Sequence, residues 1–294
     1  MSLRTIDFIL SHPLSSKNKI KAFQRFFSWQ LRSRLIGKPV TYDFVNESRL
    51  LVYPGMTGAT GNVYAGLHEF HDMGFVLHAL REGDVFVDVG ANIGSYTVLA
   101  GAAVGANCIA IEPVPCTFLH LLENMELNRL QNSVECLNIG IGKDRGTLQF
   151  SADEDTMNHV VADAEVCDRT IDINVERLDD VLKGLVPTVI KIDVEGWESN
   201  VISGARDVFS KQEPLAVLME FGLGERYGFN DQQLYEEVLD FGFKRVSYNP
   251  FERTLVHSET NGLTDGNILF MKDVDYFQQR VQSAPKFKSL GVSI

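Results

Sequence analysis

The sequence is poor in cysteine, and its four cysteines do not form a metal-binding pattern. Cys108, Cys116, Cys136 and Cys167 include no C-x-x-C pair and do not stand at zinc-like spacing from histidines. We therefore expect no structural metal, and reduced thiols in a cytoplasmic setting. With 294 residues, of which 45% are hydrophobic and 22% charged, the chain can bury a large core without metals or disulfides.

Long apolar runs are also absent. No stretch approaches the roughly 20 apolar residues of a transmembrane helix. The N-terminus lacks the basic, apolar and small-residue regions of a secretory signal. These absences lead us to expect a protein that stays inside the cell. The net charge of −12 would repel a phosphate backbone, which argues against nucleic acid as a partner.

Acidic residues are missing from the segment 17–38, which holds seven Lys or Arg residues. Its apolar residues recur at steps of three and four and so mark one face of a helix: Ile20, Phe23, Phe27, Leu31 and Leu35. Two interpretations stay open. The apolar face packs on the core or on the second subunit of a homodimer, which we favour, or the basic amphipathic helix makes peripheral contact with an anionic membrane.

The remainder of the chain predicts an α/β fold. From Asp84 onward, short apolar runs alternate with helical patterns, as in βαβ units with a mainly parallel sheet. We expect an N-terminal extension over residues 1–62, a core domain over 63–275 and a C-terminal tail over 276–294. The expected strands are 84–89, 107–112, 134–139, 188–193, 215–221, 243–248 and 267–272.

The ends of these strands predict where a ligand binds. In open α/β sheets the ligand lies outside the carboxyl ends of the strands. This rule selects Gly90, Glu112, Ile139, Asp193 and Glu220. The long segment 143–176 predicts an extra hairpin beside the site.

A glycine turn follows the first core strand. Gly90 and Gly94 lack a Cβ, so the chain can bend sharply there, and a helix beginning at Ser95 can present free N–H groups to a carboxylate. A dinucleotide fingerprint, G-x-G-x-x-G, would have glycines where Asn92 and Ser95 stand. A pyrophosphate is therefore a poor fit for this turn.

A carboxylate ends the second core strand. Glu112 stands 22 residues after Gly90 and precedes Pro113, where an acidic side chain can accept both hydroxyls of a ribose. S-adenosylmethionine has no phosphate but carries an ammonium, a sulfonium and a ribose, so Asp88 can also face positive charge. The residues thus favour this cofactor over NAD.

Three motifs together resemble those of the FkbM family of S-adenosylmethionine-dependent methyltransferases. They are Asp88–Gly94, Glu112–Pro113 and Ile190–Glu198, within a resemblance that runs from about Tyr64 to Lys272. The resemblance implies a Rossmann-like class I methyltransferase fold, with a seven-stranded, mainly parallel sheet flanked by helices and preceded by an N-terminal helical extension.

The resemblance also implies roles for individual residues. Glu112 would bind the ribose, and the methionine arm would lie among Asp88, Gly90, Asn92 and Gly94. Further cofactor contacts are expected from Ser95, Pro113, Asn138, Ile139 and Asp193.

Methyl transfer to a hydroxyl needs alignment of the acceptor and removal of its proton. Asp193 is the first candidate for the general base, with Glu195 two residues on and on the same side if the segment is extended. His159 is a further candidate because imidazole titrates near neutrality. Glu198 is better explained as a carboxylate at a helix N-terminus. Asp193, Glu195 and Glu220 offer oxygen ligands to Mg²⁺, but no dense ligand loop supports a metal.

The function expected from these features is an O-methyltransferase, EC 2.1.1.-, acting on a hydroxyl of a sugar, glycan or secondary metabolite. Two alternatives stay open. One is an NAD-dependent oxidoreductase, because a glycine turn followed by a strand-end acid serves both cofactors. The other is a non-catalytic binding protein on the same fold, with residues 17–38 as its working surface.

Overall fold

The computed structural model describes residues 3–151, 159–161, 169–257, 263 and 266–294. Its centre is an eight-stranded sheet in the order β12-β11-β13-β10-β9-β3-β4-β5. The strands are β3 (Val85–Val89), β4 (Asn107–Ile111), β5 (Val134–Leu137), β9 (Val189–Ile192), β10 (Ala216–Phe221), β11 (Lys244–Asn249), β12 (Thr254–His257) and β13 (Gly266–Met271). The seven predicted strands are confirmed within two residues, and β12 is an eighth.

The direction of the strands is mainly parallel. β5, β4, β3, β9 and β10 run parallel to one another, whereas β13 is antiparallel to both β10 and β11. β12 is antiparallel to β11 and extends that edge. The central strands are almost continuously buried, as expected for parallel strands covered on both faces. The predicted Rossmann-like α/β fold is confirmed.

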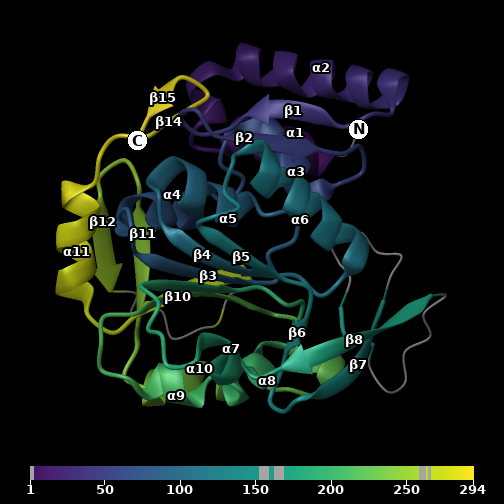
Figure 1. The fold of residues 1–294 in the computed structure, drawn as a ribbon. Coiled ribbons are helices and arrows are strands. Elements are labelled where there is room, and N and C mark those ends of the chain that lie inside the picture. Colours follow the sequence, from purple (N-terminus) through teal and green to yellow (C-terminus); the bar gives the residue numbers. More distant parts are fainter. Residues whose placement is uncertain (1–2, 152–158, 162–168, 258–262, 264–265) are drawn as a thin grey trace.

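Helices cover both faces of the sheet (Figure 1). One face carries α4 (Phe70–Ala79), α5 (Ser95–Val98) with its π-helical continuation over Leu99–Val104, α6 (Pro115–Leu127) and α11 (Val274–Ser283). The other face carries α7 (Leu178–Leu182), α8 (Glu198–Ser203), α9 (Arg206–Ser210) and α10 (Asp231–Asp240). Each face has its own apolar core, with the strands between them.

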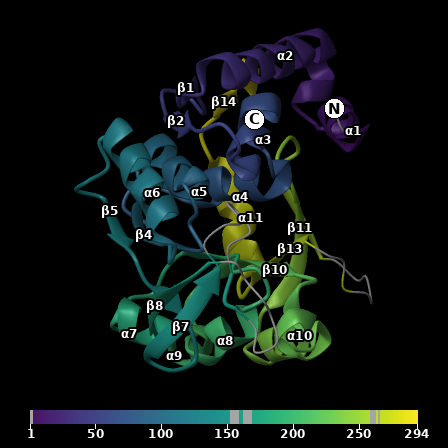
Figure 2. The same cartoon turned by 90° about the vertical axis from the view of Figure 1, so that its right-hand side faces the viewer.

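The N-terminal residues form a further layer outside α4, α5 and α6 (Figures 1 and 2). It consists of α1 (Leu3–Ser11), α2 (Lys19–Ile36), the hairpin of β1 (Val40–Asp43) and β2 (Arg49–Val52), and α3 (Thr57–Ala65). Asn124 of α6 and Asn128 just after it accept the backbone N–H groups of Leu51 and Arg49 in β2, with N to Oδ1 distances of 2.7 and 2.9 Å. These amides fasten the outer layer to the core.

The C-terminal residues return to the same layer. A small hairpin of β14 (Lys288–Ser289) and β15 (Val292–Ser293) lies beside the loop after β1, where Asn46 N donates to Lys288 O at 2.9 Å. The boundary predicted at residue 62 falls inside α3, so that helix belongs to both predicted parts. Among the described residues, no helix combines the length and apolar character that crossing a bilayer requires.

The orientation of α2 differs from the one we favoured. Ala22, Phe26 and Trp29 face the core, each no more than 5% exposed. The apolar stripe predicted to be covered is open, with Ile20 74% and Leu35 75% exposed. The expectation that this stripe packs on the core was wrong. The helix is apolar on two sides, and the side that carries Phe26 and Trp29 makes the core contacts.

The predicted insertion after β5 is confirmed as a hairpin. β7 (Gly146–Ser151) pairs antiparallel with β8 (Thr170–Glu176), and β8 also pairs with the short β6 (Gly140–Ile141). This three-stranded sheet projects past the carboxyl ends of the main strands (Figure 1). Its inner surface carries a small apolar cluster of Phe150, Val160 and Ile173.

Candidate active site

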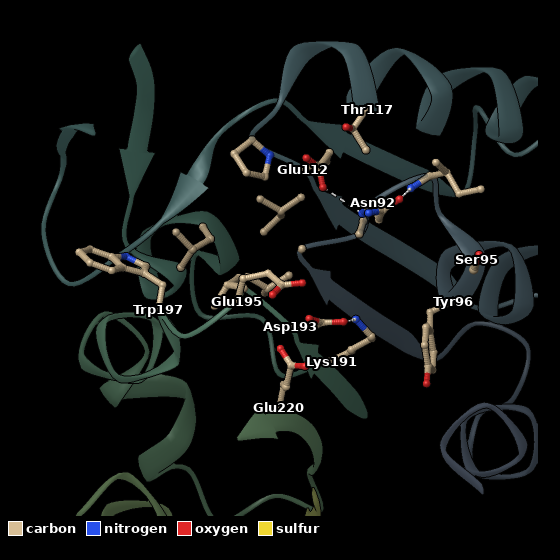
Figure 3. A pocket seen from close by; sticks show the side chains of 18 of the residues that line it. Asn92, Ser95, Tyr96, Glu112, Thr117, Lys191, Asp193, Glu195, Trp197 and Glu220 are labelled. Atoms are coloured by element: carbon tan, nitrogen blue, oxygen red, sulfur yellow. Dashed lines mark hydrogen bonds and ion pairs between the residues drawn. The ribbon is translucent and has the colours of Figure 1, made fainter. Parts of the chain in front are cut away.

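A pocket of about 250 Å³ opens at the carboxyl ends of β3, β4, β9 and β10 (Figure 3). All five residues selected by the strand-end rule line it: Gly90, Glu112, Ile139, Asp193 and Glu220. β7 contributes Phe150, and Val160 comes from the connection between β7 and β8. The prediction that the insertion lies beside the site is confirmed.

The turn after β3 forms the floor of the pocket. Gly90 has φ +79°, and a Cβ placed on it would lie 1.8 Å from the carbonyl oxygen of Asp193. The two strand ends are held together because Asp193 N donates to Val89 O at 3.0 Å. Asn92 also has a left-handed backbone, φ +51°. Only glycine fits position 90, because any side chain there would separate the two strands.

Glu112 lies at the end of β4 and is 6% exposed. Its carboxylate accepts the backbone N–H of Asn92 and that of Val114, both at 2.9 Å. Burial raises the pKa of Glu112 to about 7, against the opposing effect of these two hydrogen bonds. The carboxylate thus lies in the pocket wall and also fixes the glycine turn.

Three predicted cofactor residues lie behind the pocket wall. Asp88 is fully buried, and its Oδ2 accepts the Thr97 hydroxyl at 2.7 Å. Gly94 gives space to α6, since a Cβ there would lie 2.6 Å from Leu121 Cδ1. Asn138 donates to the backbone oxygens of Glu112 and Pro113 at 2.9 and 2.8 Å. The other predicted residues line the pocket: Gly90, Asn92, Ser95, Glu112, Pro113, Ile139 and Asp193.

Lys191 is a pocket residue that the sequence patterns did not indicate. It is 4% exposed and lies in β9, where its Nζ donates to Asp193 Oδ2 at 2.8 Å. Burial by itself lowers the pKa of Lys191, but the carboxylates of Asp193, Asp88 and Glu69 outweigh it and raise that pKa. The ammonium is therefore charged and tied to Asp193. A lysine inside an otherwise apolar central strand was the signal for it.

Acidic groups gather beside this ion pair. Carboxylate oxygens of Asp193, Glu195 and Glu220 all lie within 4.8 Å of one another. Burial, with repulsion from Asp193 and Glu195, raises the pKa of Glu220 well above its usual range, and the same burial raises that of Glu195. Asp193 and Glu195 share the pocket as predicted, although the backbone turns between them, with φ +56° at Glu195. The cluster can hold a shared proton next to an acceptor.

Glu198 and His159 lie outside the pocket wall. Glu198 Oε1 accepts the N–H groups of Val194 and Gly196, at 3.0 and 3.3 Å. This confirms the expectation that Glu198 has a structural role at the N-terminus of a helix. His159 is 2% exposed, and its backbone N–H donates to Ser151 Oγ at 3.1 Å. The structure places this imidazole beneath the hairpin, whereas Asp193 and Glu195 reach the pocket.

The N-terminal layer closes the pocket on one side. Asn62 of α3 donates to Ser95 Oγ at 3.2 Å, and its Oδ1 accepts the N–H of His68 at 2.8 Å. Glu69 accepts the Tyr96 hydroxyl at 2.8 Å and the Asn267 amide at 2.7 Å. Asn62 and Glu69 were not predicted, because Asn62 precedes the stretch that resembles the family and Glu69 stands in none of its three motifs.

Comparison with known proteins identifies the family. A model described as the Methyltransferase FkbM domain matches residues 88–246, which is more than half of the chain. The chain belongs to the FkbM methyltransferase family. The match begins at Asp88 and ends in β11, so it includes all three motifs and the β7–β8 insertion.

Two curated proteins are similar to part of this FkbM chain. The hexuronic acid methyltransferase AglP of Haloferax volcanii is 32% identical over 132 residues, covering 44% of this chain and 53% of that protein. Methyltransferase 1 of Beauveria bassiana is 28% identical over 163 residues, covering 47% of this chain and 65% of that protein. The chain thus spans between about half and two thirds of the length of these relatives.

Among solved structures, P. horikoshii TYW2 in complex with MeSAdo has a TM-score of 0.44 to this chain at 12% identity, covering 86% of this chain and 84% of that one. The assignment of this fold to the class I methyltransferases rests on the strand order and on the antiparallel β13 described above. The FkbM match begins at residue 88, after α3 and α4. Asn62 and Glu69 therefore line the pocket from outside the matched residues.

Proposed function

We propose that this chain is an S-adenosylmethionine-dependent O-methyltransferase that acts on a hydroxyl of a sugar within a glycan. The observation that carries the proposal is the pocket itself. It brings the strand-end acid Glu112 together with the ion pair of Lys191 and Asp193, at the carboxyl ends of neighbouring parallel strands. The family supports methyl transfer, and the name of one relative, a hexuronic acid methyltransferase, supports a sugar derivative as the acceptor.

The residues of the pocket fit the proposed cofactor. Gly90 lines the pocket and has no side chain, so a ligand can touch the backbone of this turn. Glu112 would hold the ribose hydroxyls, and Asn92 and Ser95 would line the methionine arm. Five acidic side chains line the pocket against the single lysine among its described residues, which suits a cation: Glu69, Glu112, Asp193, Glu195 and Glu220. When bound, S-adenosylmethionine supplies a methyl group activated by its sulfonium.

The protein's own task is to position the acceptor and remove its proton. Asp193 is the proposed general base, since its carboxylate lies in the pocket and accepts a charge-assisted hydrogen bond from Lys191. Lys191 also orients the carboxylate, which leaves its second oxygen for the acceptor hydroxyl. Glu220, protonated because of burial and its acidic neighbours, reduces the negative charge beside Asp193. These groups accelerate the reaction by alignment and proton transfer.

The β7–β8 insertion is the proposed acceptor side. Phe150, Val160 and Trp197 form an apolar wall opposite the glycine turn. A sugar ring presents apolar C–H faces together with hydroxyls, and such a wall with nearby carboxylates suits both. The acidic lining disfavours a carboxylate on the acceptor, so we expect a neutral sugar to be methylated faster than its uronic acid counterpart.

Calorimetric titration tests the cofactor. We expect S-adenosylmethionine to bind the wild-type chain, NAD not to bind, and Glu112→Ala to weaken S-adenosylmethionine binding at least tenfold, because a charge-assisted hydrogen bond is worth about 1.5–3 kcal/mol. Asn138 lies behind the pocket wall, so Asn138→Ala serves as the control for effects of loop packing on S-adenosylmethionine binding. NAD binding, or no S-adenosylmethionine binding to the wild type, contradicts the proposal.

Acceptor chemistry needs a second assay. Methyl transfer to matched pairs of glycosides, one bearing a neutral hexose and one the corresponding hexuronic acid, is measured by release of S-adenosylhomocysteine. Transfer to a hydroxyl of the neutral member is the expected result. If only the uronic acid is methylated, the assignment of a neutral acceptor is wrong, while the assignment of the cofactor stands.

A further inference from the structure

The outer face of α2 is an unusual surface for this molecule. We define it by Ile20, Phe27, Leu31 and Leu35, whose side chains are 74%, 59%, 61% and 75% exposed. Nine large apolar side chains are exposed among the described residues, and four of them lie on this one helix. Scattered exposed apolar residues need no explanation, but a row of four on one helix does.

This face lies opposite the side of α2 that holds the core. At 100° per residue, Ile20, Phe27 and Leu31 point away from Trp29, which is 5% exposed. On the core side, Phe26 packs against Tyr64 with ring centroids 5.1 Å apart, and Arg25 donates to the Tyr64 carbonyl. The helix is therefore fixed mainly by its inner side, although the ring of Phe27 on the outer face also meets that of Phe26, with centroids 5.4 Å apart. Figures 1 and 2 both show α2 as the outermost element.

The charge around the outer face is positive, in a chain of net charge −12. Of the seven basic residues in 17–38, Arg25 is directed inward, and the other six are exposed: Lys17, Lys19, Lys21, Arg32, Arg34 and Lys38. No acidic residue stands in the segment to neutralise them. Apolar side chains surrounded by Lys and Arg match the two components of an anionic membrane surface, its acyl chains and its headgroups.

A second copy of the chain fits this surface less well. Pairing the outer face with its own copy about a two-fold axis would bring the basic side chains of both helices together, which is unfavourable. Pairing it with an acidic region elsewhere on a second copy would be heterologous, and would build rings or open filaments rather than a closed dimer.

The surface is also continuous with a cavity that leads toward the active site. A cavity of about 730 Å³ lies between α1, α2 and α3, and both Phe27 and Arg34 line it. His68 lines this cavity and also the active-site pocket. The cavity beside α2 therefore shares His68 with the active-site pocket, although no residue of α2 lines that pocket.

We propose that the outer face of α2 rests on an anionic membrane surface and holds this chain at the membrane as a peripheral protein. Phe27 and Leu31 would enter the boundary between headgroups and acyl chains. The exposed basic side chains other than Lys17, whose ammonium lies 3.6 Å from the ring centroid of Phe251, would contact anionic headgroups. The proposal does not depend on the identity of the cofactor or the acceptor.

Vesicle flotation of the full chain tests the proposal. We expect the wild type to float with vesicles of phosphatidylcholine mixed with phosphatidylserine, not with phosphatidylcholine alone, and to be released by high salt. The double variant Phe27→Ser, Leu31→Ser should remain at the bottom of the gradient. Replacing Lys21 and Arg34 by Gln should weaken partitioning about fivefold for each charge, which corresponds to about 1 kcal/mol per basic side chain.

A matched control is available elsewhere on the surface. Leu119 and Val256 are 60% and 59% exposed, so Leu119→Ser, Val256→Ser removes similar apolar area from other elements and should float like the wild type. Thermal melting checks that every variant is folded. Absence of flotation with anionic vesicles, equal flotation with neutral ones, or equal flotation of the Phe27 and Leu31 variant overturns the proposal. So does a wild-type dimer that this variant converts to a monomer, because the face would then be covered by a second copy.

Discussion

Single residues decide what chemistry the pocket supports, and the buried pair of Lys191 and Asp193 is the main example. A lysine that is 4% exposed remains charged only because carboxylates surround it, and its ammonium donates a hydrogen bond to Asp193. Glu195 and Glu220 lie nearby, but burial favours their protonated forms. Asp193 is therefore the best-placed acceptor for a hydroxyl proton.

The first prediction at this scale concerns Asp193→Asn. The amide keeps the shape of the side chain but cannot accept a proton, so we expect kcat to fall by about 10²–10⁴. Binding of S-adenosylmethionine should change by much less, since the main proposed contact of its ribose is Glu112. Single-turnover methyl transfer and calorimetric titration on the same variant separate the two effects.

Glu195→Gln distinguishes the two neighbouring carboxylates. It should lower kcat less than Asp193→Asn does, because the ammonium of Lys191 is hydrogen-bonded to Asp193 and burial raises the pKa of Glu195. If Glu195→Gln is the more damaging variant, the general base has been assigned to the wrong residue.

At the scale of elements, we predict that the β7–β8 hairpin contributes to acceptor binding and not to cofactor binding. Phe150 comes from β7 and lines the pocket, whereas the glycine turn and Glu112 come from β3 and β4. We predict that Phe150→Ala raises the KM for the acceptor about tenfold, the order expected from an apolar contact of about 1–3 kcal/mol, and leaves the Kd of S-adenosylmethionine unchanged.

Leu148→Ala provides the comparison for that prediction. Leu148 is also in β7 and packs against the same small cluster, but it does not line the pocket. It should leave the KM of the acceptor near the wild-type value. Equal effects of the two variants would show that the hairpin acts only through its folding, and a weaker S-adenosylmethionine Kd in Phe150→Ala would contradict the division of the pocket.

The strands and the pocket position followed from the sequence because both depend on local patterns. Runs of Val and Ile bounded by turns mark buried parallel strands, and a parallel sheet gathers its carboxyl ends at one edge. Gly90, Glu112 and Asp193 could therefore be placed together from the sequence alone. The side-chain directions at Asp88 and Asn138 could not, because a motif locates a residue near a site without fixing which way it points.

Local sequence patterns could not predict two other features. The inner side of α2 was missed because both sides of the helix carry apolar residues, and periodicity does not tell which one meets the core. Asn62 and Glu69 reach the pocket through the packing of α3 and α4 on α5 and β13, which depends on contacts between distant parts of the chain.

At the scale of the whole molecule, buried carboxyl groups connect stability to pH. Burial raises the pKa values of Asp72, Glu112 and Glu198 to about 7 in the folded state. Because the folded state then binds more protons than the unfolded state between about pH 4.5 and 7, the free energy of unfolding falls as pH rises through this range. The stabilisation from these protons is complete in mild acid and lost above pH 7.

Glu198 offers the cleanest test, because it does not line the pocket and its Oε1 accepts two backbone N–H groups that a glutamine oxygen can accept equally. We predict that Glu198→Gln matches the wild type at pH 5 but is more stable at pH 8, by up to about 3 kcal/mol, since the amide cannot ionise. Urea denaturation at both pH values measures the difference, with Glu225→Gln at an exposed position as the control for charge removal.

Parallel pH profiles for Glu198→Gln and the wild type would mean that the Glu198 carboxyl ionises without cost in the folded chain. The loss of stability at high pH would then come from Asp72, Glu112 and the general repulsion within a chain of net charge −12.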